Sequence, residues 1–490
     1  MQNATAIYNT AHFTQPGNHL LNAGSEQAAD SAEWRSLFAK DNLPTLALMV
    51  LALWLHATNT MLAATTLPVA AVEIGGIHLI SWAFSLYLLG SVVVGASMSV
   101  FATRWGIRNT MLAAAAVYSV GCLVCGWSQQ MSQFLIGRTI QGIGGGGLVA
   151  LVYIIQSRFF HDSLIPRVVA CMSVVWMVSS FFGPMVGGVF ATLGIWRYAF
   201  IVFAAQAVLL IFIVRHLIPT DNSTASESKP VVSFFSLALL SVCIFLVCLA
   251  GTTQEYTKSA LLVTSGIALL ALFVWRDAQQ NTGRMLPNGA LQITRPVGAG
   301  LALTLCMTAC LMSFVVYGPI ILIRLYGLTP LSAGFVLIIE ALSWGTFAIL
   351  FSGRPAHQER LIMVSGSVAV VLGITAQTLT VPATSVTLIA LALIVSCGGF
   401  GAMWGYIIKR VVENAPADDK TRASSIMPVT QQVGFALGAA LAGVIANGLG
   451  FSDLSTNDEL RALSPWLFAG FLPVAIGGCL LSWWFTDSSR

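Results

Sequence analysis

The sequence predicts an all-α protein that crosses a lipid bilayer many times. Hydrophobic residues make up 57% of the chain and charged residues only 9%, whereas soluble proteins contain about 45–50% and about 25% of these classes. Apolar runs of about 17–25 residues recur along the chain, and each can cross the hydrocarbon core as a helix. Such runs are too long for the strands of a membrane barrel, and only a helix satisfies its own backbone inside lipid.

Fourteen runs can be counted, and the basic residues predict their orientation. Most of the 23 lysines and arginines fall on the side of the membrane that holds the N-terminus, as expected for cytoplasmic segments. Both termini are therefore predicted to be cytoplasmic, and the net charge of +4 does not indicate a nucleic-acid partner. The runs begin near Pro44, His78, Thr110, Ser132, Val168, Tyr198, Val232, Ala260, Pro296, Ser332, Leu361, Val386, Ser425 and Pro465.

The order of the runs predicts two six-helix bundles with two additional helices between them. The segment 219–231 is rich in Ser, Thr, Asp and Pro, which is typical of a linker. Two bundles of six would be related by a pseudo-twofold axis. The predicted parts are a cytoplasmic N-terminal tail (1–43), an N-terminal bundle (44–218), a cytoplasmic linker (219–231), two additional transmembrane helices (232–275), a cytoplasmic loop (276–295), a C-terminal bundle (296–485) and a cytoplasmic C-terminus (486–490).

The first run carries a polar stripe. His56, Asn59 and Thr60 are spaced i, i+3 and i+4, so they share one helix face. They would either line a cavity or hydrogen-bond a neighbouring helix, and the sequence leaves both readings open.

The fourth run carries a buried charge. Arg138 lies about seven residues into it, where a charge costs a few kcal/mol on insertion scales. Gln141 follows three residues later on the same face. A functional reading places both residues on a central cavity, with Arg138 biasing protonation of a nearby acid or holding an anionic group. The alternative is a structural ion pair or a clamp on backbone carbonyls.

Glycines follow in the fourth and fifth runs. Gly142 and Gly144 belong to a pattern that formally matches a dinucleotide-binding loop, but no strand precedes it, so close helix packing is the better interpretation. In the fifth run, Pro184 follows Gly183 and removes a backbone donor, which kinks a helix. The spacing of Gly183 and Gly187, with Gly188 adjacent, predicts a close-packed face. This segment could form a compliant contact between two moving bundles. Alternatively, its kink could have a structural role only.

The tenth run contains the only carboxylate deep within any predicted span, Glu340. Burial favours the protonated form of a carboxyl group, so Glu340 is the natural proton carrier. Its alternative is a structural acid paired with a polar neighbour. Trp344 lies one turn further on the same face, and together with Trp176 of the fifth run it is a candidate for the lining of a substrate cavity.

The 9 cysteines fall within the runs. Cys122 and Cys125 match a C-x-x-C pattern, but their apolar surroundings favour packing over redox chemistry or metal binding. No cofactor or metal is predicted, and no nucleophile–base pair points to an enzyme.

On these residues the chain resembles the major facilitator superfamily, in its fourteen-span drug:proton antiporter branch. The two motifs on which this resemblance mainly rests are Arg138-x-x-Gln141-Gly142-x-Gly144 in the fourth run and Gly183-Pro184-x-x-Gly187-Gly188 in the fifth. Trp196-Arg197-Tyr198-x-Phe200, Trp82-x-x-x-x-Tyr87-x-Leu89 and Gln432-x-Gly434 match further motifs. The resemblance covers nearly all of residues 44 to 485. It implies alternating access in a twelve-helix core, usually driven by inward proton flow.

The chain departs from the family pattern at two acidic positions. The loop between the second and third runs keeps Arg104, Gly106 and Arg108, but Thr103 stands where the family usually has Asp. The first helix usually has an Asp nine residues before its Pro, and Asn59 occupies that position here. These departures shift the expected coupling to Glu340, argue against small dications, and leave an amphipathic or anionic substrate.

The leading hypothesis is a secondary active transporter that exports an amphipathic small molecule in exchange for protons. One alternative is an uptake symporter or uniporter for a metabolite or metal chelate. Another is a non-transporting sensor or scaffold. The expected partners are a small-molecule substrate, protons and the lipid bilayer, for a monomer in a bacterial inner membrane.

Overall fold

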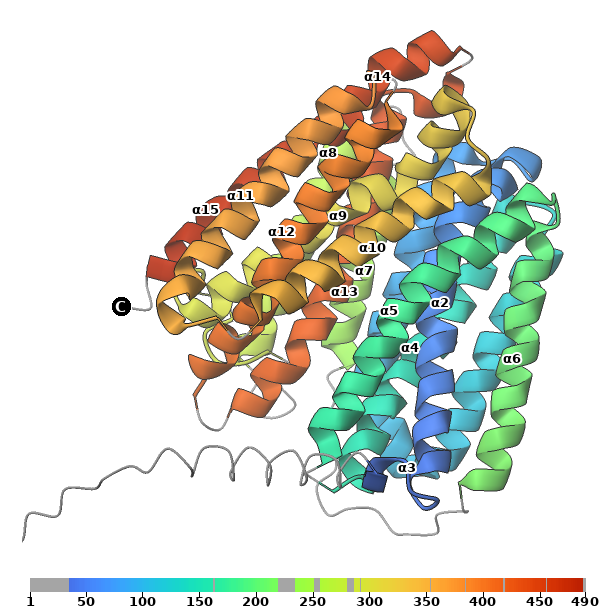
Figure 1. Cartoon of the computed structure of the whole chain (residues 1–490), viewed down its shortest axis with the longest axis vertical. Helices are drawn as coiled ribbons and strands as arrows, with labels where there is room; N and C mark the ends of the chain where they lie inside the picture. Colours follow the sequence, from blue (N-terminus) through green and yellow to red (C-terminus); the bar gives the residue numbers. More distant parts are fainter. Residues whose placement is uncertain are drawn as a thin grey trace, which may run out of the picture.

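The computed structural model is all-helical in the part of the chain that it describes (Figure 1). Most of the predicted N-terminal tail, the predicted linker 219–231 and part of the predicted loop 276–295 lie outside the described residues. The structure describes residues 35–161, 164–218, 234–250, 256–279, 286–290, 292–352, 354–383, 385–416, 419–454 and 456–487.

The N-terminal half contains the helices α2 (Leu43–Glu73), α3 (Ile80–Trp127), α4 (Met131–Phe159), α5 (Ile165–Thr192) and α6 (Trp196–Leu217), with a short 3₁₀ turn, η1 (Ile77–Leu79), before α3.

Helix α3 contains two spans separated by a break at Gly106. Its 48 residues would extend about 70 Å as a straight helix, more than twice the thickness of a hydrocarbon core. Gly106 has φ 79° and ψ 155°, a conformation open essentially to glycine alone. The Thr110 hydroxyl donates to the Phe101 carbonyl at 3.1 Å, although nine residues separate them, so the chain bends sharply here.

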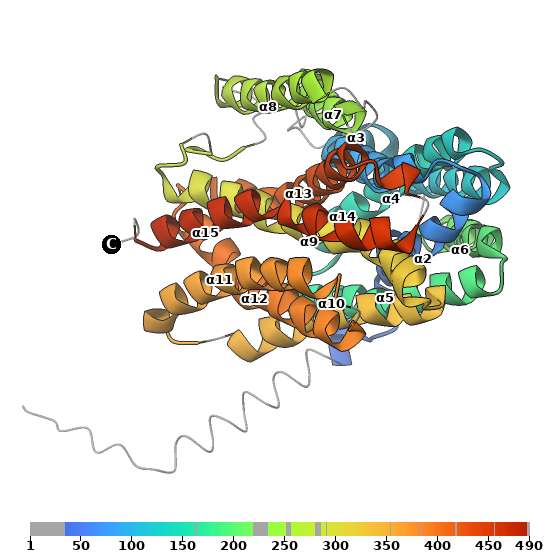
Figure 2. The same ribbon diagram turned by 90° about the horizontal axis from the view of Figure 1, so that it is seen from above.

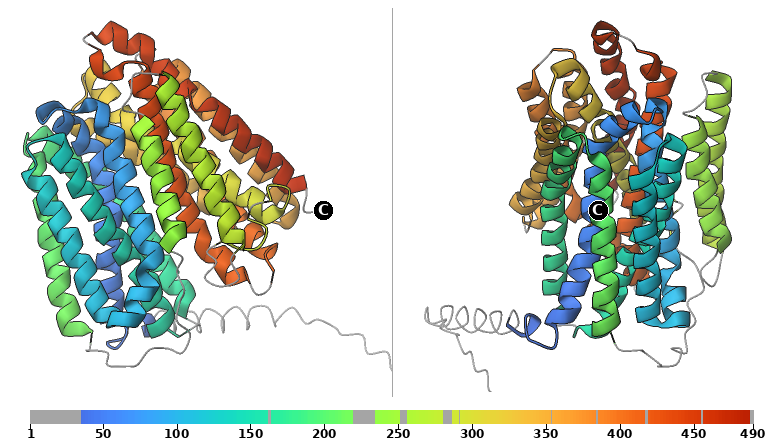
Figure 3. Two further views of the ribbon diagram at one scale, coloured as in Figure 1. Left: turned by 180° about the vertical axis from the view of Figure 1, so that it is seen from behind. Right: turned by 90° about the vertical axis from the view of Figure 1, so that its right-hand side faces the viewer.

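Helices α7 (Phe234–Ala250) and α8 (Tyr256–Gln279) form a pair on one flank of the molecule (Figures 2 and 3). Helix α7 contacts both α3 and α13 (Lys420–Gly448). The Trp82 indole nitrogen of α3 donates to the Cys248 carbonyl at 2.9 Å, and its ring meets Phe245 edge-on at 5.8 Å. Helix α7 therefore covers the seam between the two halves on this side.

The C-terminal half comprises α9 (Pro296–Tyr326), α10 (Pro330–Phe351), α11 (Ala356–Thr380), α12 (Val386–Glu413), α13, the turn η4 (Phe451–Asp453), α14 (Asn457–Ala469) and α15 (Leu472–Asp487). Local sequence explains several starts. Thr329 accepts a hydrogen bond from the Ser332 amide at the start of α10, and Thr456 with Glu459 forms a capping box at the start of α14.

Within the described residues, 12 helical stretches are long and apolar enough to cross a membrane. One of them, Ile77–Trp127, has 51 residues and contains the Gly106 break. The stretch Ala238–Ala250 of α7 is apolar but shorter. The expectation of an all-helical, multi-pass membrane protein is thus confirmed.

The two halves meet along two seams, one between α3 and α13 and one between α5 and α10. Across the first, Ser85 donates to the Ala436 carbonyl at 3.0 Å. Across the second, the Leu331 amide donates to the Thr192 hydroxyl at 3.2 Å. The halves touch at the end where α5 finishes and α10 begins, and they diverge toward the end where α2 begins (Figures 1 and 3).

Candidate functional site: a buried arginine cluster and a half-buried acid

Arg138 is fully buried in the N-terminal half and is held by three neutral oxygen acceptors. Its Nη1 donates to Asn59 Oδ1 at 2.7 Å and to Gln141 Oε1 at 2.6 Å, and its Nε donates to the Ala83 carbonyl at 3.2 Å. The guanidinium also stacks over the Tyr87 ring, 4.1 Å from its centre. The charge is therefore shared among α2, α3 and α4.

The glycines of α4 allow this cluster to form, because they let α4 approach α3 at backbone distance. A methyl group on Gly144 would lie 2.6 Å from the Tyr118 Cα, and one on Gly142 would lie 2.9 Å from the Tyr87 Cα. Real Cβ atoms do not approach a backbone so closely, so only glycine fits. The sequence argument for close helix packing by these two glycines agrees with this geometry.

Aromatic side chains enclose the cluster. The Tyr87 hydroxyl lies 3.0 Å from His56 Nδ1, and the Tyr118 hydroxyl donates to the Leu55 carbonyl at 2.8 Å. The His56 ring meets Trp176 of α5 edge-on at 5.9 Å. His56, Asn59, Arg138, Gln141 and Trp176 thus come together from three helices. Thr60 differs from them, since its hydroxyl bonds the His56 carbonyl of its own helix at 2.8 Å.

No carboxylate lies among the interaction partners of Arg138 in the described part of the chain. Asn59, which stands where the family usually has Asp, occupies the place of the counter-charge. The amide nitrogen of Gln141, Nε2, donates a hydrogen bond to Cys122 Sγ at 2.9 Å. The cluster is therefore a hydrogen-bonded cation and not an ion pair.

The glycine–proline segment of α5 lies partly on the seam. A methyl group on Gly188 would lie 2.6 Å from the Leu331 Cα, and one on Gly334 of α10 would lie 2.8 Å from the Pro184 carbonyl oxygen. Gly183 and Gly187 face α2 instead, close to the Thr58 and Leu62 carbonyls. This single segment joins α5 to its own bundle and to the opposite one.

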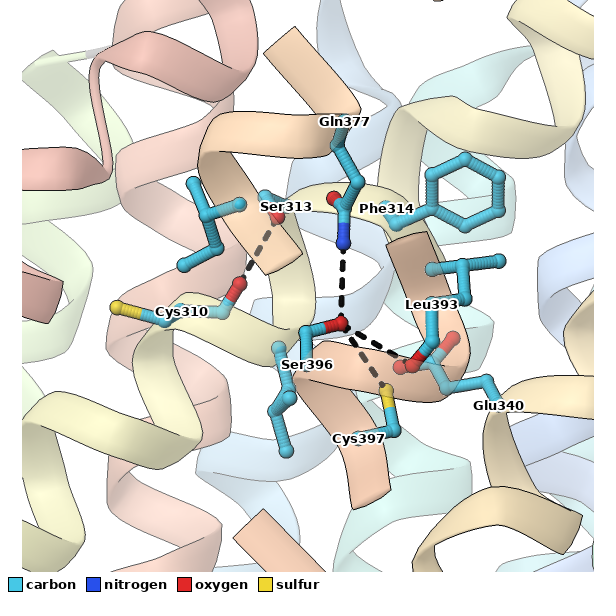
Figure 4. A pocket seen from close by; sticks show the side chains of 10 residues that line it. Cys310, Ser313, Phe314, Glu340, Gln377, Leu393, Ser396 and Cys397 are labelled. Atoms are coloured by element: carbon cyan, nitrogen blue, oxygen red, sulfur yellow. Dashed lines mark hydrogen bonds between the residues drawn. The ribbon is translucent and has the colours of Figure 1, made fainter. Parts of the chain in front are cut away.

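Glu340 lies in the middle of α10, in a pocket within the C-terminal half (Figure 4). The pocket encloses about 190 Å³ of gaps between atoms but has no room for a whole water molecule. Gln377 of α11 donates to the Ser396 hydroxyl of α12 at 3.1 Å, and the Cys397 thiol lies beside the Glu340 carboxyl. Within the described residues no lysine, arginine or histidine pairs with Glu340.

The structure keeps the two predicted groups apart. Trp344 packs edge-on against Phe400 of α12, with ring centres 5.4 Å apart, and so belongs with Glu340 in the C-terminal half. Arg138 and its partners belong to the N-terminal half, and no contact described for the chain links the two sets. Any coupling between them acts through the relative motion of the halves.

The basic loops differ between the halves. Arg104 is exposed beside the Gly106 break, and Arg108 donates to the Arg215 carbonyl of α6 at 2.9 Å. In the C-terminal half, Glu359 of α11 pairs with Lys409 of α12 at 2.5 Å and with Arg410 at 3.8 Å.

Sequence reasoning missed the ion pairs of Glu359 in the C-terminal half, because Glu359 and Lys409 are separated by fifty residues. It also missed Tyr87 beneath Arg138 and the Gln377–Ser396 pair beside Glu340. Tyr87 belongs to the motif Trp82-x-x-x-x-Tyr87-x-Leu89, and this motif could have identified it as a candidate site residue. No comparable signal marks Gln377.

Two helical halves that meet along glycine seams, with a buried arginine in one half and a half-buried acid in the other, define the architecture of a secondary membrane transporter. The chain belongs to the Major Facilitator Superfamily, whose model matches residues 49–439. It is a membrane transporter for small molecules and not an enzyme.

Among curated proteins, the chain is 29% identical over 487 residues to a probable multidrug-efflux transporter of Mycobacterium tuberculosis, covering 95% of this chain and 99% of the relative. A multidrug efflux pump of Staphylococcus aureus is 24% identical over 408 residues, covering 82% and 89%.

Solved structures resemble the fold at low sequence identity. A D-xylose–proton symporter matches with a TM-score of 0.63 at 14% identity, covering 90% of this chain and 97% of the symporter. A POT family transporter in complex with 5-aminolevulinic acid matches with 0.65 at 13% identity, covering 89% and 93%. These likenesses concern the fold alone.

Proposed function

We propose that the protein exports amphipathic small molecules in exchange for protons, with Glu340 as the proton carrier. The observation that carries this proposal is an acid in the middle of α10 with no cationic partner among the described residues. A permanent ion pair would hold a carboxylate charged, whereas an unpaired acid in an apolar pocket can gain and lose a proton as its access to water changes. The multidrug-efflux names of two relatives support export over uptake.

The cycle follows from the two seams. We propose that the end where α2 begins faces the cytoplasm, and that substrate enters and Glu340 releases its proton when the halves are apart at this end. Closing that side and opening the other exposes Glu340 to external protons. One proton supplies about 3.7 kcal/mol at 100 mV and one pH unit, enough for a gradient of about 500-fold.

The membrane topology proposed for this cycle has fourteen spans, in the order six, two and six, with the boundaries predicted above. Counting α3 as two spans at Gly106 and including the apolar α7 supports this number. We further propose both termini in the cytoplasm, a bacterial inner membrane and a monomer. The position of Lys and Arg in the sequence supports the orientation.

The proposed roles of the remaining residues follow their positions. His56, Asn59, Thr60, Gln141, Trp176 and Trp344 contribute to the substrate cavity. Arg138 cannot give up its proton in a protein, so its part in coupling is electrostatic. The conformational elements are Arg104, Gly106, Arg108, Gly142, Gly144, Gly183, Pro184, Gly187 and Gly188.

The test is internal pH in liposomes that contain the purified protein, challenged with lipophilic cations, anions and neutral amphiphiles. Proton movement triggered by one class of compound is expected, and it would identify the substrate class. Substrate flux without proton movement would contradict proton coupling and favour a uniporter, and inward accumulation would favour a symporter.

The α5–α10 seam provides a second prediction. A Thr192→Cys, Leu331→Cys double variant should form a disulfide on oxidation, because the Leu331 amide and the Thr192 hydroxyl lie 3.2 Å apart. Locking this end closed should lower transport more than tenfold, and reduction should restore it. Each single-cysteine variant is the control, and a protease site inserted in 219–231 reveals the cross-link on a gel. Full transport by the cross-linked protein would show that this seam does not open.

A further inference from the structure

The cluster around Arg138 contains donors that have no acceptor. Arg138 Nη2 and Asn59 Nδ2 are both buried and neither has a hydrogen-bond partner. The two side chains touch, since Arg138 Nη1 donates to Asn59 Oδ1 at 2.7 Å. Buried donors without an acceptor are costly and rare in folded proteins. Two of them in adjacent side chains indicate that an acceptor belongs here.

Within the described residues, the same cluster contains no counter-charge. The oxygens that Arg138 contacts belong to two amides and one backbone carbonyl. The titratable groups that interact with its charge are His56, Tyr87, Tyr118, Cys122 and Cys125, and none of them is a carboxylate. The Tyr87 ring compensates part of the charge. A buried cation nevertheless destabilises a protein when no anion accompanies it.

We propose that Arg138 and Asn59 bind an anion, which accepts hydrogen bonds from Arg138 Nη2 and Asn59 Nδ2. Two sources share this chemistry: a chloride ion, or the carboxylate of a transported molecule. The second source rests on the proposed transport function and the first does not. Arg138 and Asn59 are both fully buried, so an anion that they bind lies inside the N-terminal half and away from bulk water.

Asn59 is the residue that distinguishes this cluster from an ion pair. An aspartate there would supply a negative charge to Arg138 from within the protein. The amide instead supplies an oxygen to Arg138 and leaves an N–H free to donate. An external anion therefore completes the cluster in this chain.

The test measures thermal unfolding of the purified full-length protein in detergent. One arm titrates potassium chloride against potassium methanesulfonate at constant ionic strength. The other titrates decanoate against decanol at fixed chloride. A saturable stabilisation is expected in one arm or both. Asn59→Asp should weaken the apparent affinity at least tenfold, because its carboxylate occupies the place of the anion.

Two controls separate this inference from proton coupling. Asn414→Asp makes the same change at an exposed site, and it should leave the anion effect intact. Glu340→Gln should also leave it intact, even though that variant tests the proposed proton carrier. Loss of transport in Glu340→Gln with a normal anion effect would show that the two sites are independent.

The outcomes decide the source. Saturation by chloride that is lost in Asn59→Asp identifies a resident halide. Saturation by decanoate alone identifies an acidic substrate. No saturable effect, or an equal effect in Asn59→Asp, overturns the proposal. Should Asn59→Asp fail to fold, crystals of the unmodified protein soaked in bromide or in 2-bromodecanoate decide: an anomalous peak beside Arg138 is expected in at least one soak, and its absence from both overturns the proposal.

Discussion

Replacing Glu340 with Gln is expected to abolish uphill export. Glutamine fills the same space but cannot bind and release a proton, so the energy of the proton gradient no longer reaches the substrate. The concentration ratio held by everted vesicles should fall from as much as about 500-fold toward one. Passive exchange of substrate down its own gradient should persist, because the two halves and their seams are unchanged.

The matched control is Glu413→Gln, the same chemical change at the exposed end of α12, where the acid lies 3.9 Å from Lys409. This variant should keep at least half of the original activity, since an exposed ion pair contributes little. Full uphill export by Glu340→Gln would remove Glu340 as the carrier. The next titratable candidate within the described spans would then be His56.

Replacing Gly144 with Leu is expected to prevent correct folding. A Cβ at this position would lie 2.6 Å from the Tyr118 Cα, and these are backbone atoms of two packed helices that cannot turn aside. Separating α4 from α3 would also remove Tyr87 from the Arg138 guanidinium. Overpacking typically costs about 1–3 kcal/mol and more against a rigid backbone, so the yield of monodisperse protein should fall more than tenfold in gel filtration.

Gly405→Leu is the control for this experiment. Gly405 also lies inside a helix, but an added Cβ would meet nothing within 4 Å. The yield of this variant should stay within twofold of the original. Equal loss in both variants would show that membrane insertion, and not the α3–α4 contact, limits the yield.

A pattern that lies within one helix could be interpreted from the sequence alone. The charge at Arg138, the amide at Gln141 and the glycines after them lie on one turn after another, so helix geometry alone places them on neighbouring faces. The same holds for the glycine–proline segment of α5. The hydropathy of the runs predicted a helical membrane protein, since each helix must satisfy its own backbone in lipid.

Contacts between helices were not predictable in the same way. Tyr87 lies under Arg138 although about fifty residues separate them, and Gln377 reaches Ser396 from another helix. The position of α7 over the α3–α13 seam also has no signature in its own apolar sequence. Each of these depends on how helices cross, which a single helix does not encode.

The sequence by itself determined the class of fold, the family and the two ionisable residues within apolar runs, because these depend on apolar length and on rare charges in such runs. Only the tertiary structure decided that Arg138 lacks an acid among its described partners and that Glu340 lies in the opposite half. The physical reason is that the helices pack against one another in lipid and not in water. In lipid, apolar surface does not drive helices together, so small residues and polar contacts select each neighbour. That selection is a property of pairs of helices, and it becomes visible only when both are in place.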